Sequence, residues 1–237
     1  MEEKLQLSKR LQAVVELVSK GRKVADIGCD HAYLSIYMIE HNIADTVIAL
    51  DVNAGPLERA KDNIVKKHME QRIETRLSDG MKELKTGEVD TILLAGMGGG
   101  LMQRILSGNK EVLAEVEELV LQPQSEVRQV RVFLEQIGFQ IVKENMVLED
   151  GKYYVMMKAE RKQHVEPLRQ EVFYRYGKDL LENRNLCLQR FLQKEEDKMQ
   201  MIMKCLQENP SELNSERLKE VKEDVTYCRE GLAYYDM

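Results

Sequence analysis

The stretch over residues 23–34, K-V-A-D-I-G-C-D-H-A-Y-L, constrains the fold more than any other part of the chain. An apolar run ends in an acid and a glycine and then passes into a helix-forming segment, which predicts a parallel strand, a tight turn and a helix. A turn of this kind brings backbone N–H groups and a carboxylate to one point at the carboxyl end of a strand. We therefore expect a nucleoside cofactor to bind there.

The residues after the glycine indicate which cofactor. A dinucleotide-binding turn, G-x-G-x-x-G, needs its second glycine so that a pyrophosphate can approach the backbone. Here Gly28 is followed two residues later by Asp30, whose carboxylate would repel a diphosphate. S-adenosylmethionine carries no phosphate, and carboxylates attract its sulfonium and ammonium groups. Asp26 and Asp30 therefore favour S-adenosylmethionine as the cofactor.

Three more predicted strands, 46–52, 73–80 and 89–100, end in acids or glycines at the same edge of the sheet. Asp51 lies about 20 residues beyond the glycine turn, where an acid accepts the ribose hydroxyls of an adenosine. Asp79 is placed to accept from the adenine amino group, and the glycines after the fourth strand let a flat ring approach the backbone. The predicted cofactor-binding residues are Asp26, Gly28, Cys29, Asp30, Asp51, Val52, Asn53, Ser78, Asp79, Gly80, Ala95, Gly96, Met97 and Gly98.

A plainer interpretation exists for each of these residues. Any one acid, taken alone, is explained equally well as a helix cap or a surface charge, and residues 98–100 as a flexible turn. The same succession of strand, acid or glycine, and helix recurs along the chain, however. Because ligands in open α/β sheets bind outside the carboxyl ends of the strands, the recurrence favours one shared site.

Five motifs carry a resemblance to a known family. They are L-S-K-R-L (7–11), D-I-G-C-D-H-A-Y-L (26–34), A-G-M-G-G (95–99), L-Q-P-Q (121–124) and E-D-G-K-Y-Y (149–154), within about the first 160 residues. With them the sequence resembles the bacterial tRNA (adenine(22)-N1)-methyltransferases, a class I S-adenosylmethionine-dependent group. The resemblance implies tRNA as the substrate and N1 of adenine 22 as the methylated atom. Cys29 departs from the family, which often has Ser there.

The pattern up to residue 160 alternates strand and helix, so we expect an α/β, Rossmann-like class I methyltransferase domain over 1–160 with a seven-stranded sheet. The expected helices span 7–18, 32–40, 56–67 and 125–137, the last with Ser125 as its cap. Further strands are expected at 119–122, 139–148 and 152–159. The last two form a hairpin that turns at 149–151.

Residues 161–237 have a helical period and no strand signal. Apolar residues at steps of three and four form two seams, separated by the breaker E-N-P-S-E at 208–212, which predicts an antiparallel coiled-coil arm. The alternative is two core helices packed on the sheet. Over 161–204 basic residues outnumber acidic ones, and the candidates for phosphate contact are Arg169, Arg175, Lys178, Arg184 and Arg190, interleaved with aromatic side chains.

Composition sets the remaining bounds. The 237 residues, 43% of them hydrophobic, can form one α/β domain with an appendage. A net charge of −6 argues against broad nucleic-acid binding. The spacing of the four cysteines and four histidines signals neither a metal site nor a disulfide framework. No run is long and apolar enough for a membrane span, and the N-terminus lacks signal-peptide features. We expect a cytoplasmic monomer without metal or membrane attachment.

The expected catalytic residues follow from the chemistry of adenine N1. That nitrogen has its own lone pair, so the enzyme needs to position it and to stabilise the positive charge that develops on the ring. Many amino-methylating relatives carry an acid or Asn followed by two prolines after the fourth strand, but residues 95–98 here have no polar side chain. We expect backbone carbonyls there, aided by His31, Tyr33 and Arg10. In the plainer interpretation His31 is a helix cap, Tyr33 is a core residue and Arg10 is a phosphate ligand.

Two other functions are compatible with the same residues. One is a class I methyltransferase of a small molecule or a protein, with the helical arm as a partner or dimer contact. The other is a cofactor-binding RNA adaptor without catalysis, which the missing acidic motif after the fourth strand allows. Because N1 lies on the Watson–Crick edge, a tRNA substrate would present its adenine unpaired or flipped out.

Overall fold

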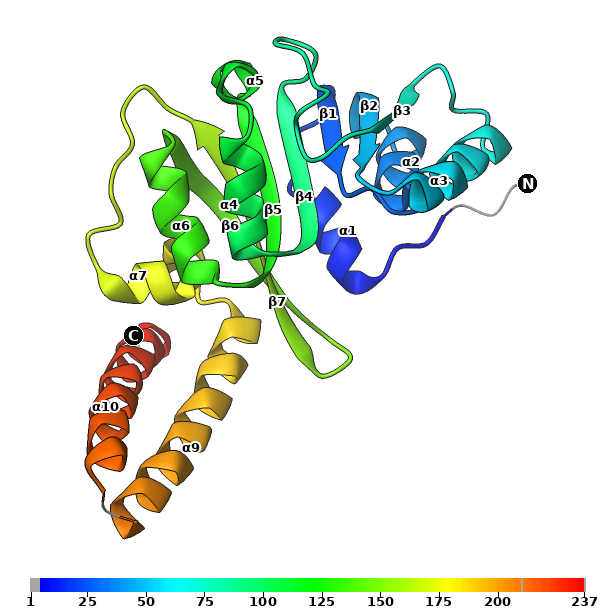
Figure 1. Ribbon diagram of the computed structural model, residues 1–237. Helices are drawn as coiled ribbons and strands as arrows, with labels where there is room; N and C mark the ends of the chain where they lie inside the picture. The colour runs from blue at the N-terminus through cyan, green and yellow to red at the C-terminus, as the bar shows by residue number, and fades with distance from the viewer. Residues whose placement is uncertain (1–4, 210, 237) are drawn as a thin grey trace. The chain divides into compact units, whose positions relative to one another are not determined.

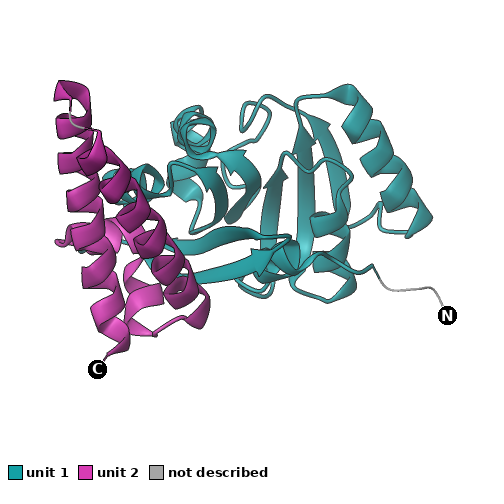
Figure 2. Ribbon diagram, turned by 90° about the horizontal axis from the view of Figure 1, so that it is seen from below, with its two compact units in different colours: residues 1–166 teal, residues 167–237 magenta. Residues whose placement is uncertain are grey.

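The computed structural model describes residues 5–209 and 211–236. It divides into two compact units, residues 1–166 and residues 167–237, which Figure 2 colours separately. The first unit is built on a sheet and the second is entirely helical in its described part. Each unit is described on its own below.

The first unit contains a seven-stranded sheet in the order β3-β2-β1-β4-β5-β7-β6. The strands are β1 (Arg22–Ile27), β2 (Ala44–Asp51), β3 (Ile73–Leu77), β4 (Thr91–Gly98), β5 (Glu118–Ser125), β6 (Phe139–Glu149) and β7 (Lys152–Arg161). The first five run parallel to one another, and β7 pairs antiparallel with both β5 and β6. This topology confirms the expected Rossmann-like methyltransferase fold (Figure 1).

Helices pack against the sheet and form two hydrophobic clusters. The helices are α1 (Lys9–Val15), α2 (Tyr33–Glu40), α3 (Ala54–Lys66), α4 (Gly99–Ser107), α5 (Lys110–Glu115) and α6 (Val127–Gln136). One cluster contains residues of α1, α2 and α3, and the other contains residues of α4, α5 and α6. Successive strand residues alternate between them, with Val24 and Leu93 in the first and Ala25 and Leu94 in the second. The buried faces thus hold the carboxyl ends of β1, β2 and β4 in fixed positions.

Two helix predictions need correction. The first helix ends at Val15, three residues before the predicted end, and Ser8 caps its start. Ser125 is not the cap of α6. Its extended backbone continues β5 and pairs with Gly98, so the helix begins only after Glu126, which adopts a left-handed conformation with φ of 55°. The prediction failed because strand pairing across 27 residues overrode a local capping signal.

The hairpin between β6 and β7 has the predicted turn. Asp150 and Gly151 both have positive φ, 48° and 76°, which is the backbone of a two-residue type I′ turn. Asp-Gly is among the residue pairs that this turn favours, because both positions lie in the left-handed region. The turn places Glu149 and the aromatic residues of β7 next to α1.

The second unit consists of α7 (Glu171–Tyr176), α8 (Lys178–Glu182), α9 (Leu186–Glu208), α10 (Glu212–Leu232) and the short 3-10 helix η1 (Ala233–Tyr235). As predicted, α9 and α10 are two long helices that lie side by side (Figure 1). They are antiparallel, since Tyr235 Oη donates to the Asn185 carbonyl at 2.9 Å, near the start of α9, while α10 starts beside the end of α9. Pro210, within the predicted breaker, lies outside the described residues.

Two further observations on the described residues concern membrane spans and metal sites. Among residues 5–209 and 211–236, no helix combines the length and the apolar character that crossing a membrane requires. Within the same ranges, no group of three or more His, Cys, Asp or Glu side chains is arranged to hold a metal ion.

Candidate functional site

The glycine turn after β1 is held by the neighbouring strand. The backbone N–H groups of Gly28 and Cys29 both donate to the Leu50 carbonyl, at 2.7 and 3.0 Å. Gly28 has a φ of 77°, and a Cβ at this position would come within 2.2 Å of the Met97 methyl carbon. Only glycine fits both the backbone and the space. The turn therefore brings the ends of β1, β2 and β4 together.

Asp51, at the end of β2, faces this turn. Its Oδ2 accepts from the Asp30 N–H at 3.2 Å, and its Oδ1 accepts from the Asn53 N–H at 2.8 Å. The carboxylate is buried, yet each oxygen has a further lone pair available. The backbone thus orients a carboxylate whose remaining capacity can accept two hydroxyl groups. Val52 and Asn53 follow it on the surface of the unit.

Asp26 is the buried carboxylate of the site. Its Oδ2 accepts from Ser35 Oγ at 2.6 Å, and both residues are buried. Burial raises the pKa of Asp26 to about 6; the hydrogen bonds from Ser35 partly oppose this shift, and the Asp51 carboxylate adds to it. A bound cation near Asp26 would favour its charged form. Asp26 therefore fits the positively charged part of a ligand.

Cys29 is buried beside the same carboxylates. Burial raises the pKa of its thiol, and the charges of Asp26 and Asp51 raise it further. The side chain thus stays a neutral thiol at physiological pH. It contributes packing and shape to the turn, and it is a poor nucleophile.

A cavity of about 350 Å³ opens next to the turn. Its lining residues come from α1, from the β1 turn and the start of α2, and from the ends of β4 and β5. They are Arg10, Leu11, Asp26, Gly28, Cys29, Asp30, His31, Tyr33, Leu34, Ala95, Gly96, Met97 and Gln124. The three predicted catalytic residues thus share one cavity with seven of the predicted cofactor-binding residues.

Arg10 reaches the end of β4 through Gln122. The Gln122 Oε1 accepts from Arg10 Nη1 at 2.7 Å and from the Gly96 N–H at 3.2 Å. The Arg10 backbone N–H donates to Glu149 Oε1 at 3.1 Å, and its guanidinium lies 5.4 Å from the centroid of the Tyr154 ring. This network joins α1, β4, β5 and the hairpin. The sequence reasoning missed Gln122 and Glu149 as site residues, although both belong to the motifs quoted for the family resemblance.

His31 and Tyr33 also line the cavity. Their rings stack with centroids 5.4 Å apart and planes 25° from parallel. His31 Nε2 lies 3.5 Å from Asp30 Oδ1, so the imidazole also faces a carboxylate. Tyr33 is 43% exposed and is not a core residue. A planar ring entering the cavity would find an aromatic face there.

Ser78, Asp79 and Gly80 lie after β3 and do not line this cavity. The Ser78 hydroxyl closes its own loop, since it donates to the Gly80 carbonyl at 2.8 Å and accepts from the Glu83 N–H at 3.2 Å. Asp79 is exposed and pairs with Lys82 at 2.6 Å, a hydrogen bond that lowers the pKa of Asp79. Their contact with a cofactor stays a prediction.

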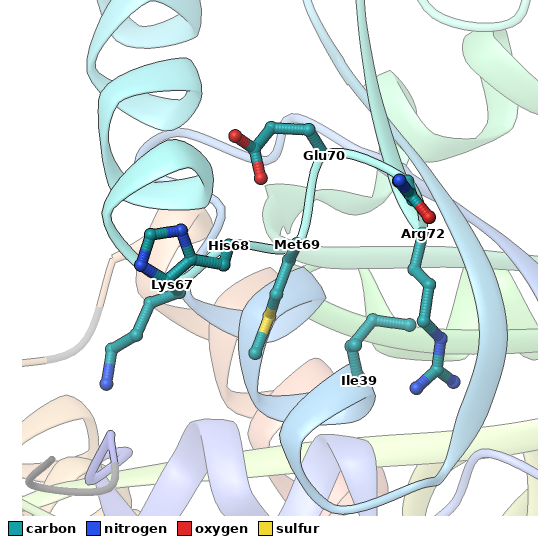
Figure 3. Close-up of a pocket in the computed structure, with 7 residues that line it drawn as sticks. Ile39, Lys67, His68, Met69, Glu70 and Arg72 are labelled. Atoms are coloured by element: carbon teal, nitrogen blue, oxygen red, sulfur yellow. The ribbon is translucent and has the colours of Figure 1, made fainter.

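A second, larger cavity of about 570 Å³ lies where α3 ends and β3 begins. Figure 3 shows Met69 and Arg72 extending beside Ile39, while Glu70 points away from them. Two basic residues that line this cavity make contacts within the unit. Lys67 pairs with Glu40 at 3.1 Å, and Arg72 donates to the carbonyl of Ala44 at 2.7 Å. The cavity lies at the amino ends of the strands, opposite to the edge where α/β sheets bind ligands.

The fold and this site define a class I methyltransferase. In agreement, the family described as "Methyltransferase domain" matches residues 7–157. The chain is 40% identical over 156 residues to the tRNA (adenine(22)-N(1))-methyltransferase of Bacillus subtilis (strain 168). That match covers 66% of each chain, just under two thirds of the curated relative's length.

Solved structures agree over nearly the whole chain. The crystal structure of the B. subtilis m1A22 tRNA methyltransferase has a TM-score of 0.85 and 31% identity, covering 97% of this chain and 100% of its own. Streptococcus pneumoniae Sp1610 in complex with S-adenosyl-L-methionine has a TM-score of 0.84 and 31% identity, covering 96% of this chain and 100% of its own. The chain belongs to the tRNA (adenine(22)-N1)-methyltransferase family.

Proposed function

We propose that this protein transfers the methyl group of S-adenosylmethionine to N1 of adenine 22 in tRNA. The observation that carries the proposal is the single cavity in which the carboxylate-bearing turn of a cofactor site meets polar and aromatic side chains from α1, α2 and β5. Membership of the family, and the cofactor bound by the S. pneumoniae relative, support the same reaction.

The side chains around the turn fit this cofactor. Asp51 accepts the two ribose hydroxyls, because backbone N–H groups already orient its carboxylate. Asp26 and Asp30 face the cationic methionine part, and Gly28 lines the cavity beside them. In this proposal the cofactor-binding residues are Asp26, Gly28, Cys29, Asp30, Asp51, Val52, Asn53, Ser78, Asp79, Gly80, Ala95, Gly96, Met97 and Gly98.

The protein mainly has to position the adenine. When bound, S-adenosylmethionine supplies an electrophilic methyl group that the N1 lone pair attacks in line. Backbone carbonyls at residues 95–98 accept hydrogen from N6 and stabilise the charge that develops on the ring. His31 and Tyr33 give the base a stacking surface. Arg10 is a cation and does not stabilise that charge; it fixes Gln122 and the end of β4 and faces the RNA backbone.

The substrate is a folded tRNA whose adenine leaves its stack to enter the cavity. The helical arm contributes contacts to the RNA backbone, because its exposed cations Arg169, Lys178, Arg184 and Arg190 can pair with phosphates. In this proposal the enzyme acts in the cytoplasm as a monomer. Light scattering during gel filtration tests the monomer.

A labelling experiment tests the reaction. The protein is incubated with methyl-labelled S-adenosylmethionine and either of two tRNA transcripts, one with adenine and one with guanine at position 22, and the RNA is digested to nucleosides. We expect labelled 1-methyladenosine from the first transcript only. If the label appeared instead in protein or small molecules added as acceptors, the protein would be a methyltransferase of another substrate. If the cofactor bound but its methyl group reached no acceptor, the protein would be an adaptor.

A further inference from the structure

The end of β5 carries two glutamines, at alternate positions of the strand, that have different surroundings. Gln122 is 0% exposed, and both ends of its amide are used: Oε1 accepts from Arg10 and Gly96, and Nε2 donates to the Pro123 carbonyl at 3.1 Å. Gln124 is exposed and lines the cavity. Within the described residues its carboxamide has no hydrogen-bond partner. Gln122 is therefore part of the framework of the site, whereas Gln124 faces the cavity with its amide donor and acceptor available.

The Gln124 carboxamide lies where the fourth strand lacks a side chain. A Cβ on Gly96 would have two neighbours within 4 Å, Gln124 Nε2 and Arg10 Nη1, both at 3.7 Å. Gly96 itself has a φ of 79°, which L side chains rarely adopt. A polar group from β5 therefore lies beside the backbone of Gly96, although β4 itself ends without one.

We propose that Gln124 recognises the target adenine through N6 and N7, an inference that rests on the proposed function. A carboxamide offers one acceptor and one donor side by side, which matches the N6 amino donor and the N7 acceptor of adenine. Guanine presents two acceptors, O6 and N7, at the same edge and would leave the glutamine oxygen facing an oxygen. Gln124 thus selects adenine over guanine.

This contact also suits the reaction. It uses the edge of the base that carries N6 and N7, so N1 stays open to the methyl group. Methylation places positive charge on the ring and makes the N6 hydrogens better donors. The hydrogen bond from N6 to the Gln124 oxygen therefore strengthens as the methyl group is transferred, and an interaction that is stronger in the transition state than in the ground state accelerates the step.

The test is a cycle of two changes, one in the protein and one in the base. Rates are measured as kcat/KM on tRNA with adenine 22 and on the same tRNA with 7-deazaadenine 22, which keeps N1 and N6 but lacks N7. We expect Gln124→Ala to lose roughly 5- to 150-fold on adenine, the range of one bidentate base contact. The wild type should lose a smaller factor on 7-deazaadenine, because only the bond to N7 is lost and the bond from N6 remains. On 7-deazaadenine, Gln124→Ala should therefore lose less than on adenine, by the part that the N7 bond contributes.

A second variant separates the two hydrogen bonds. Gln124→Glu keeps the acceptor for N6 but loses the donor to N7, so replacing N7 should cost this variant little. Gln71→Ala removes an exposed glutamine that lines the second cavity and serves as the matched control, with unchanged ratios. Cofactor affinity and melting temperature should stay at wild-type values in Gln124→Ala, because its side chain is exposed.

The outcomes are distinguishable. If Gln124→Ala lost the same factor on both bases, or lost nothing, the glutamine would not contact N7 and the inference would be overturned while the proposed function stood. If the wild type formed no 1-methyladenosine on the adenine tRNA, the proposed function itself would fail, and this assignment with it.

Discussion

The sheet unit and the helical arm hold their side chains in different ways. In the sheet unit, strand residues pack into hydrophobic clusters on both faces of the sheet. Leu93 and Leu94, which belong to different clusters, are therefore both fully buried. In the arm, two helices share one seam, in which Leu192 and Cys228 are fully buried, while other apolar side chains stay in solvent: Met201 is 73% exposed and Leu213 75% exposed. A pair of helices cannot enclose a core. The sheet unit therefore fixes a small site in place, whereas the arm offers a long, solvated surface.

Removing residues 167–237 is expected to have the largest effect. The clusters around the sheet contain only residues of the first unit, so the shortened protein should fold and bind S-adenosylmethionine with unchanged affinity. Its kcat/KM for tRNA should fall by at least about tenfold, because several phosphate contacts are lost together. Calorimetry and the methylation assay measure the two quantities. Full activity on tRNA would show that the arm does not contact the substrate.

Asp51→Ala should weaken binding of the cofactor without changing the binding of tRNA. The ribose hydroxyls lose a charge-assisted acceptor, which costs about 1.5 to 3 kcal/mol, or roughly 10- to 150-fold in dissociation constant. Titration calorimetry measures it, with Asp62→Ala as a control that removes an exposed acid from α3. The salt dependence of tRNA binding should not change. Unaltered cofactor affinity would make Asp51 a purely structural residue.

Asp26→Asn should reveal a pH-dependent cost of the buried carboxylate. Because burial raises the folded pKa of Asp26 to about 6, above its unfolded value of about 3.9, the folded state holds its proton longer. The free energy of unfolding therefore falls as the pH rises from about 4 to 6, by at most about 3 kcal/mol. The variant keeps an acceptor for Ser35 and cannot ionise, so it should be more stable than the wild type at pH 7, by about 1 to 3 kcal/mol.

Urea unfolding at pH 4 and pH 7 measures that difference. The advantage of Asp26→Asn should largely disappear at pH 4, where the wild-type carboxyl is protonated in the folded state and about half protonated in the unfolded state. Cofactor affinity should fall in the variant, since a charge opposite the cationic part of the ligand is lost. A stability difference that is the same at both pH values would show that ionisation is not its cause.

The smallest effects distinguish two arginines of the arm. Arg175 pairs with Asp224 at 2.6 Å and with Glu171 at 3.0 Å, and it lies 4.4 Å from the centroid of the Tyr227 ring. Arg175→Ala should therefore lower the stability of the arm, by about 1 kcal/mol. Arg184 is exposed, and Arg184→Ala should instead reduce the slope of log affinity against log salt by about 0.9. Thermal melts and tRNA binding at two salt concentrations separate them; identical behaviour would contradict this assignment.

The sequence was a good guide where the signal was local. An apolar strand followed by an acid and a glycine places Asp26, Gly28 and Asp51 correctly at strand ends, because parallel strands carry their carboxyl ends to one edge. The hairpin turn and the seams of α9 and α10 are local patterns of the same kind. Their assignments required no knowledge of distant parts of the chain.

Contacts between distant residues could not be predicted in this way. No periodicity shows that Arg10 would reach Gln122, or that Glu149 would accept from the Arg10 backbone. Helix α4 was missed because it starts with Gly99 and Gly100, which are poor helix formers. Arg175 was predicted to contact phosphate from the local excess of basic residues alone, since its ion-pair partner Asp224 is 49 residues away in the sequence.

The hydrogen bond between the Arg10 backbone and Glu149 has a consequence for synthesis of the protein. The two residues are separated by 139 positions. At translation rates of 5–20 residues per second, roughly 7 to 28 s pass between the emergence of the first helix and that of the hairpin that holds it. The Gly28 turn can close early on its neighbouring strands. The wall that contains Arg10 is therefore completed only after the hairpin has been synthesised.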